Sequence, residues 1–119
     1  MDFLSVLKEG YEKNEHLHLL IKYNHFHMGM KINNDLFFLQ FNHGLCIIST
    51  ETNVETYPSL EVTDKAVEDL SRGVLLSELI KRKDSIYFGT LRDQLLMESI
   101  LYLSLTDLHD KLKKVLVIN

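Results

Sequence analysis

The six histidines are the residues whose type and spacing most suggest chemistry in this chain of 119 residues. His25 and His27 are two positions apart, so a β-strand would place both imidazoles on one face, where they can share a metal ion. His16 and His18 would share a face only on a strand, and a third ligand such as His43 would have to come from elsewhere. Because no Cys, Asp or Glu stands at ligand spacing beside either pair, we predict solvent-facing histidines and no metal site.

Cys46 is the only cysteine, and it lies in an apolar run with Leu45, Ile47 and Ile48. A single cysteine cannot form a disulfide within the chain, which agrees with a reducing compartment. Its apolar neighbours offer nothing to lower the pKa of the thiol, and free cysteine is among the most buried residue types. We therefore predict a buried structural role for Cys46.

The carboxylates show no pairing of the kind that acid–base catalysis uses. In the predicted helices they are spread over helix faces and ends, as solvated or end charges: Glu68, Asp69, Glu78, Asp93 and Glu98. The chain has no GxGxxG, Walker, HExxH or GxSxG motif. We therefore predict a protein that is not an enzyme, with no catalytic residue and no cofactor.

Length and composition indicate one globular domain over residues 1–119. The formal net charge of −4 argues against a general nucleic-acid-binding surface. No apolar run exceeds four residues, so no membrane-spanning segment is predicted. The first ten residues have no apolar stretch of signal-peptide length, and we expect a cytoplasmic protein.

The N-terminal part predicts two helices and then a meander of antiparallel strands. Residues 2–13 have apolar side chains at helical spacing. Residues 15–23 fit a strand or a helix, and Asn14 as an N-cap favours the helix. Alternating apolar residues and short turns predict strands at 26–32, 35–41 and 45–50, followed by a polar loop at 51–58.

The second half alternates short strands with capped helices. Thr63 is a predicted N-cap, Gly73 a predicted C-terminal stop, and Thr90 the N-cap of a long apolar helix. The predicted elements are a strand at 60–62, helices at 64–72 and 75–83, a strand at 85–88, and helices at 91–105 and 107–116.

Four segments in this half form a pattern of caps and glycines: Leu60–Asp64, Leu70–Gly73, Ser85–Gly89 and Leu91–Leu103. The pattern resembles the sterol-carrier-protein type-2 family over about residues 26–103. The resemblance implies an α+β fold in which helices cover a five-stranded, mostly antiparallel sheet. It also implies an apolar tunnel for a lipid or other hydrophobic molecule, and a family that also serves as a non-catalytic accessory domain in larger enzymes.

The predicted helix at residues 91–105 is apolar almost all the way round. Its apolar side chains fall on three faces: Leu91, Leu95, Tyr102 and Leu105; Leu96, Ile100 and Leu103; and Met97 and Leu101. A surface helix needs only one apolar stripe, so this helix must be covered on several sides. The cover can be the sheet with the terminal helix, a second copy of the protein, or a bound lipid, and apolar stripes are most often core.

The leading hypothesis is a small carrier that binds a hydrophobic molecule, such as a fatty acid or sterol-like lipid, between the sheet and this helix. Its candidate apolar wall is Phe37, Leu39 and Phe41 on the sheet with Leu96, Ile100 and Leu103 on the helix. The alternative is a non-catalytic interaction module, a homodimer or accessory subunit, whose own side chains fill the cavity. An enzyme with a histidine-bound metal is a distant third hypothesis.

Overall fold

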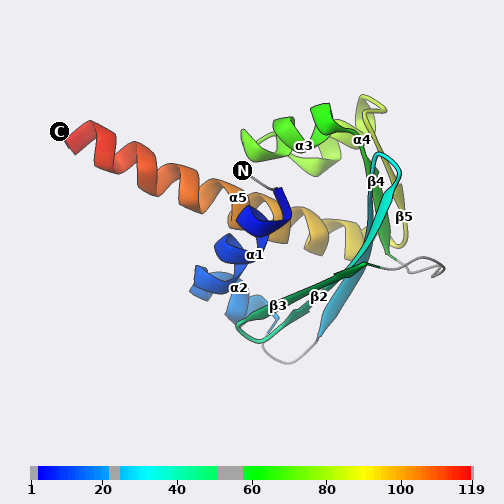
Figure 1. The fold of residues 1–119 in the computed structure, drawn as a ribbon, viewed down its shortest axis with the longest axis horizontal. Coiled ribbons are helices and arrows are strands. Elements are labelled where there is room, and N and C mark those ends of the chain that lie inside the picture. The colour runs from blue at the N-terminus through cyan, green and yellow to red at the C-terminus, as the bar shows by residue number, and fades with distance from the viewer. Residues whose placement is uncertain (1–2, 22–24, 51–57, 119) are drawn as a thin grey trace.

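One sheet curls around a long helix, and the other helices lie on the same inner side (Figure 1). This computed structural model describes residues 3–21, 25–50 and 58–118, with side chains described as far as residue 106. The predicted loop at 51–58 lies outside this part except for Pro58. The elements are α1 (Phe3–Lys13), α2 (Glu15–Leu20), β1 (Phe26–Ile32), β2 (Asp35–Asn42), β3 (Leu45–Thr50), β4 (Ser59–Val62), α3 (Asp64–Ser71), α4 (Leu76–Lys81), β5 (Ser85–Phe88) and α5 (Leu91–Ile118).

The sheet has the strand order β3-β2-β1-β4-β5, which confirms the predicted five-stranded, mostly antiparallel sheet. Strands β1, β2 and β3 form the predicted antiparallel meander. Strand β4 lies parallel to β1 on the other side, with Leu60 opposite Met30, and β5 is antiparallel to β4. Residues 33–58, which include β2 and β3, connect β1 to β4, and parallel strands need such a long connection because a hairpin turn joins only antiparallel strands.

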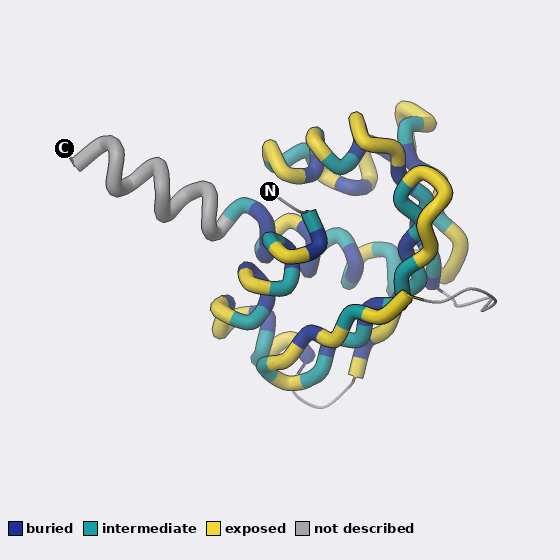
Figure 2. The backbone as a smooth tube through the Cα atoms, viewed as in Figure 1, coloured by how far each residue is buried: buried dark blue, intermediate teal, exposed yellow. Residues whose placement is uncertain are grey.

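The two faces of the sheet differ because successive side chains of a strand point to opposite sides. Phe37, Leu39 and Phe41 share the inner face, as predicted, and Leu39 and Phe41 are completely buried. On the outer face, Leu36 is exposed, and Lys31 of β1 lies 3.8 Å from Glu61 of β4, measured between Nζ and Oε1. The core therefore lies on the inner side of the sheet, against the helices (Figure 2).

The segment that fits both a strand and a helix is a helix, α2, as predicted. Asn14 has an extended backbone, and its Oδ1 accepts a hydrogen bond from the Leu17 backbone N–H at 3.2 Å. The Asn14 side chain also donates to the Leu103 carbonyl oxygen at 3.4 Å. This buried amide therefore starts α2 and ties it to α5.

The predicted caps of α3 and α5 are confirmed. The Thr63 hydroxyl oxygen accepts from the Ala66 N–H at 3.2 Å, and the Thr90 hydroxyl oxygen accepts from the Asp93 N–H at 3.1 Å. Gly73 ends α3 with a φ of 93°, in the left-handed region that glycine adopts without strain. These signals are local in the sequence, so each can be recognised before the fold is known.

A helix C-terminus of the same geometry ends α4, but its left-handed residue is Lys83, with a φ of 64°. After α3, the N–H groups of Gly73 and Val74 donate to the carbonyl oxygens of Leu70 and Asp69. After α4, Lys83 and Asp84 repeat this pattern by donating to Ile80 and Leu79. Both ends therefore form the paired hydrogen bonds of a Schellman motif: Gly73 and Val74 at one end, Lys83 and Asp84 at the other.

The two helices expected at 91–105 and 107–116 are one continuous helix, α5. Neither proline nor glycine occurs between Thr90 and Asn119, so nothing in the sequence interrupts the hydrogen-bond ladder. The described helices include none long and apolar enough to cross a bilayer.

The neighbouring elements cover one side of α5 and leave another open (Figure 2). The buried stripe is Met97, Ile100, Leu101, Ser104 and Leu105. Leu91 and Leu95, by contrast, remain 69% and 53% exposed. The sheet and the other helices therefore cover only some of the apolar faces of α5.

Helix α1 crosses the buried side of α5 at Gly10. A side-chain carbon on Gly10 would collide with the backbone carbonyl of Ser104. Glycine is therefore required here by the close approach of two helix backbones.

Candidate functional site

A groove of about 810 Å³ opens between the first turns of α5 and residues 20–21 and 25–26, at the end of α2 and the start of β1. From the N-terminal side of the chain it is lined by Leu20, Ile21, His25 and Phe26. The first turns of α5 supply the facing wall, with Thr90, Arg92, Asp93, Leu95, Leu96 and Ser99. The groove therefore adjoins the side of α5 that the other elements leave uncovered.

The groove has apolar and polar parts. Phe26 is buried at the start of β1, and its ring stacks on Phe41 with 6.2 Å between ring centroids. Leu95 and Leu96 face the groove from α5, one turn after the Thr90 cap. An apolar wall next to polar groups suits a ligand with a long apolar part and a small polar part.

The six residues predicted to form a ligand-contacting wall all belong to the inner sheet face or to α5. Leu39, Phe41 and Ile100 are completely buried in the core. Phe37 and Leu103 are partly buried against that core. Leu96 is the member of this set that lines the groove.

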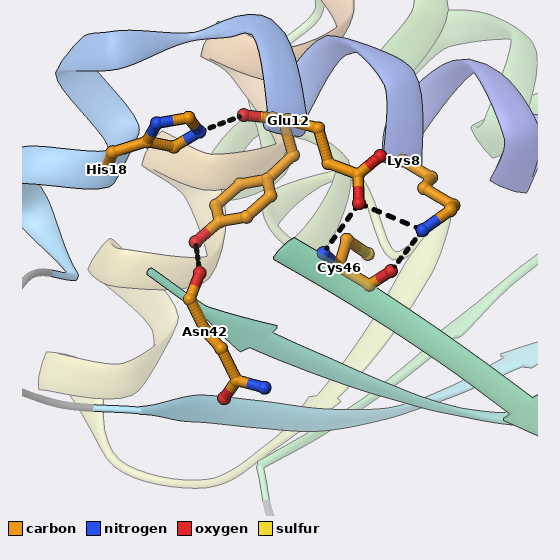
Figure 3. Close-up of polar contacts among 6 residues, drawn as sticks. Lys8, Glu12, His18, Asn42 and Cys46 are labelled. Atoms are coloured by element: carbon orange, nitrogen blue, oxygen red, sulfur yellow. Dashed lines mark hydrogen bonds and ion pairs between the residues drawn. The ribbon is translucent and has the colours of Figure 1, made fainter. Parts of the chain in front are cut away.

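Apart from the groove, a cluster of polar groups joins α1 to the edge strand β3 (Figure 3). Lys8 and Glu12 form an ion pair at 2.9 Å between Nζ and Oε2. Lys8 Nζ also donates to the Cys46 carbonyl oxygen at 2.5 Å, and Glu12 Oε2 accepts from the Cys46 backbone N–H at 3.1 Å. Two side chains of α1 thus hold both backbone polar groups of one residue on the sheet edge.

The hydroxyl of Tyr11 makes the neighbouring contact, donating to the Asn42 carbonyl oxygen at 2.5 Å (Figure 3). Its ring meets the Phe41 ring edge to face, with 4.9 Å between centroids. Burial raises the pKa of Tyr11 to about 12, so the phenol stays protonated and keeps donating at neutral pH.

Cys46 is completely buried, which confirms its predicted structural role. Burial raises the pKa of its thiol to about 12, so it is no thiolate nucleophile at neutral pH. Partial burial also acts to raise the pKa of Glu12, but hydrogen bonds from Lys8 and Cys46 and the charge of Lys8 outweigh it. The pKa of Glu12 is therefore lower than usual, and this carboxylate stays ionised.

The histidines whose side chains the structure describes do not converge on one point. His25 and His27 are exposed at the start of β1, while His18 turns inward so that its Nε2 lies 3.0 Å from the Tyr11 carbonyl oxygen (Figure 3). The rings of His18 and His43 lie 6.0 Å apart. Within residues 3–21, 25–50 and 58–106, no three His, Cys, Asp or Glu side chains gather in a way that would hold a metal ion.

One carboxylate has a role that the sequence did not reveal. Glu98 was predicted to be a solvated charge, but its Oε1 accepts a hydrogen bond from the Ser77 backbone N–H at 2.7 Å. Leu75, at the start of α4, gives that helix no side-chain cap. Glu98 therefore caps α4 from α5, 21 residues away in the sequence, and no local pattern marks such a contact.

No protein-family model and no curated protein sequence matches this chain. Solved structures do match it. The UbiJ-SCP2 ubiquinone synthesis protein has a TM-score of 0.66 and 12% identity, over 84% of this chain and 85% of that one. The sterol carrier protein domain 2 of Helicoverpa armigera has a TM-score of 0.62 and 14% identity, over 87% and 86%. At these identities the likeness shows the fold, which is that of sterol carrier protein domains.

The same fold also matches a small part of an enzyme. The stereoselective inverting sec-alkylsulfatase Pisa1 from Pseudomonas sp. is similar with a TM-score of 0.55 and 12% identity. The match covers 66% of this chain and only 13% of the sulfatase. A domain of this shape therefore occurs both as most of a small protein and as a minor part of a large one.

Proposed function

We propose that this chain is a non-catalytic carrier for a hydrophobic small molecule, such as a fatty acid or sterol-like lipid, and that the groove beside α5 is its binding site. The observation that carries the proposal is a groove of about 810 Å³ with an apolar wall, in a sterol-carrier fold. Ligand pockets commonly measure roughly 300–1,000 Å³, so this groove has room for a lipid chain.

Burial of apolar surface drives binding in this proposal. Leu20, Phe26, Leu95 and Leu96 offer the ligand a wall from which water is displaced. Each Å² removed from water contributes roughly 25 cal/mol before the cost of ordering the ligand is subtracted. Arg92, beside this wall, would hold the polar end of the ligand at the groove mouth.

The core residues of the predicted wall form the deeper part of the proposed site. Phe26 lines the groove, and its ring stacks on the ring of Phe41, which belongs to the core. A rotation of Phe26 would join the groove to Phe41, Leu39 and Ile100, so a long ligand could extend inward. Phe37 and Leu103, only partly buried, would then complete the predicted wall.

The similar structures support a carrier role through what they are called. One is a ubiquinone synthesis protein and the other a sterol carrier domain, and both names refer to hydrophobic molecules. We propose no catalytic step for this chain. Its single cysteine, Cys46, is buried in the core, and burial raises the pKa of the thiol to about 12.

Lipid mass spectrometry of the purified protein, with displacement of a fluorescent fatty acid, tests the proposal. We expect a co-purifying lipid, and about tenfold weaker binding of the fluorescent fatty acid by Leu96→Asn, since a polar amide replaces part of the apolar wall. Ile86→Asn is the matched control, because Ile86 is 51% exposed on the outer sheet face. The proposal fails if the native protein carries no lipid and does not bind the fluorescent fatty acid.

A further inference from the structure

The outer face of the sheet carries large apolar side chains that remain exposed. The described helices pack on the inner side, and a sheet face that meets only water is usually polar (Figure 1). Ile86 and Phe88 of β5 are nevertheless 51% and 45% exposed, and Leu36 of β2 is 42% exposed. Phe38 is partly buried and shares this face with Leu36, because the two are two positions apart on one strand. A partner on this face would therefore remove these side chains from water.

The registers of the strands arrange these side chains in two rows that cross β2, β1, β4 and β5. The first row has an apolar side chain at each end and opposite charges in the middle: Leu36, Lys31, Glu61 and Ile86. The second row has a phenylalanine at each end and two small residues in the middle: Phe38, Gly29, Ser59 and Phe88. A line between β1 and β4 divides both rows in half. The two halves match in apolar character and in size, and their charges are opposite.

A two-fold axis above this line and parallel to it would place each row on the same row of a second copy. Such an axis brings β1 of one copy over β4 of the other, and β2 over β5. Lys31 of one copy then faces Glu61 of the other. The apolar ends also face each other, with Leu36 against Ile86 in the first row and the two phenylalanines together in the second. The strands of the two sheets stay roughly aligned, which is a common packing of two sheets about 10 Å apart.

We propose that the outer face of the sheet binds a second copy of this chain, in a symmetric dimer whose two-fold axis runs along the line between β1 and β4. The dimer does not depend on the carrier function. The groove lies on the inner side of the sheet with α5, so pairing of the outer faces leaves it open.

The charges of the first row favour a second copy over an unrelated partner. Within one chain, Lys31 Nζ and Glu61 Oε1 lie 3.8 Å apart, and both side chains are 39% exposed. In the dimer the two pairs form a network of four charges, in which each charge has an opposite charge on its own sheet and another across the axis. A face with charges of one sign would repel its own copy, whereas this face is complementary to itself.

The shape of the face suits the same contact. The sheet curls around α5, so its outer face is convex (Figure 1). Gly29 and Ser59, in the middle of the second row, let the two copies approach, while the larger side chains at the row ends fill the space that the curvature leaves. Eight residues of each copy would bury roughly 900 Å² in total, below the size of most stable interfaces, so we expect a weak dimer with a Kd of about 10 μM.

Sedimentation equilibrium at protein concentrations from about 1 to 200 μM, on both sides of this Kd, tests the proposal. We expect the average mass of the native protein to rise toward that of two chains. Lys31→Glu and Glu61→Lys should each weaken the dimer at least about tenfold, because four like charges then meet at the axis. An equal mixture of the two variants should form a mixed dimer, since each acidic position then faces a basic one. Recovery in the mixture also shows that both variants fold.

The apolar row ends are tested by a second substitution. Phe88→Gln should weaken the dimer by about tenfold, because symmetry introduces the change at two places in the interface. Ile47→Gln is the matched control. Ile47 is 42% exposed and lies opposite Gln40 on the outer face, but β3 lies outside both rows, so this variant should dimerise like the native protein.

Three outcomes would overturn the dimer proposal. One is a native protein that stays monomeric over the whole concentration range. Another is a native dimer that neither Lys31→Glu nor Phe88→Gln weakens, which would place the interface on a different face. The third is a mixture of the two charge variants that associates no more tightly than either variant alone. Binding of the fluorescent fatty acid is a separate measurement: its absence in the native protein contradicts the carrier function, whereas these three outcomes contradict the dimer.

Discussion

Gly10 and Ser104 lie where the backbones of α1 and α5 touch. In most helix interiors, glycine is less favourable than alanine by roughly 0.5–1 kcal/mol. Here the missing side chain lets α1 approach the buried side of α5, so the usual preference is reversed. Helix propensity alone predicts that alanine at position 10 would stabilise the protein, whereas the contact with Ser104 predicts that the added methyl group would destabilise it.

Gly10→Ala is therefore expected to destabilise the protein by about 2 kcal/mol, because the added methyl must push the two helices apart. Thermal unfolding followed by circular dichroism should show a melting temperature lower by about 8 °C. Glu9→Ala, on the exposed side of the same helix, is the control and should change stability by less than about 0.5 kcal/mol. A Gly10→Ala protein more stable than the native one would show that α1 does not contact α5 at this point.

Glu12 makes stability depend on pH in a defined direction. Its pKa is lower in the folded protein than the ordinary 4.5, so the carboxylate stabilises the fold above that pH. This contribution is lost as the pH falls through the folded pKa. Glu12→Gln should therefore be less stable than the native protein by about 1 kcal/mol at pH 7 and equally stable well below pH 4. Urea unfolding at both pH values measures the difference, and a constant difference would contradict this role of the charge.

The roles of some residues could be predicted from the sequence, and those of others could not. Asn14, Thr63 and Thr90 cap helices that begin beside them in the sequence, and all three were predicted. Glu98 caps a helix 21 residues away, and Gly10 contacts a residue of another helix. Those two roles depend on distances that exist only after the elements pack.

The C-termini of α3 and α4 have the same backbone geometry and can be compared directly. Gly73 and Lys83 take the same left-handed backbone after α3 and α4, with the same pair of hydrogen bonds. A side chain at such a position costs roughly 1 kcal/mol that glycine avoids. Lys83 is exposed, so nothing but its helix end requires a particular residue there.

Lys83→Gly is expected to stabilise the protein by about 1 kcal/mol, and Gly73→Ala to destabilise it by a similar amount. Chemical denaturation of both variants checks the two signs together. Lys81→Gly, inside the last turn of α4, serves as the control and should destabilise by up to about 1 kcal/mol. If Lys83→Gly also destabilised the protein, the left-handed geometry at this end would be refuted.

Most of the elements could be predicted because their signals are local. Alternating apolar residues and short turns marked β1, β2 and β3 with nearly the observed bounds. The position of β4 beside β1 could not be read in this way, since periodicity does not say which strands are neighbours. The division of α5 into two helices was wrong because no residue there interrupts a helix.

For the whole molecule, the contact between α1 and β3 decides whether the sheet edge is free to pair. Leu45 pairs with Asn42 across the turn, so the backbone groups of Cys46 point away from β2. Lys8 and Glu12 occupy those groups and take the place of a neighbouring strand. An edge blocked in this way cannot add another chain at that position.

Lys8→Ala with Glu12→Ala is expected to aggregate several-fold faster than the native protein under mild heating, because it frees the edge of β3. Glu9→Ala with Lys13→Ala is a close control, since it removes an ion pair of the same spacing that holds no strand. Light scattering and thioflavin fluorescence at equal protein concentration compare the two. Similar aggregation of both variants would show that Lys8 and Glu12 do not protect the edge of β3 from pairing with other chains.

The candidate site was only partly predictable at this scale. The inner face of β2 and the apolar character of α5 followed from alternation and helical spacing. The groove is formed instead by the end of α2, the start of β1 and the first turns of α5. Its position depends on which side of α5 the sheet and α1 leave open, and a helical projection of an all-round apolar helix does not favour one side.

The hydrogen bonds of Lys8 and Glu12 to β3 also matter while the chain is being synthesised. Residues 45–50 carry no charged side chain, so the strand has no repulsive residue of its own while it leaves the ribosome. The N-terminal part of a chain emerges first, and the lysine and glutamate that shield this strand belong to a helix made before it. The nascent strand β3 can therefore contact α1 as soon as both segments are outside the exit tunnel. A circular permutant that moved α1 to the C-terminus would encode the same contacts, but it would release the strand first and leave it exposed to other chains during translation.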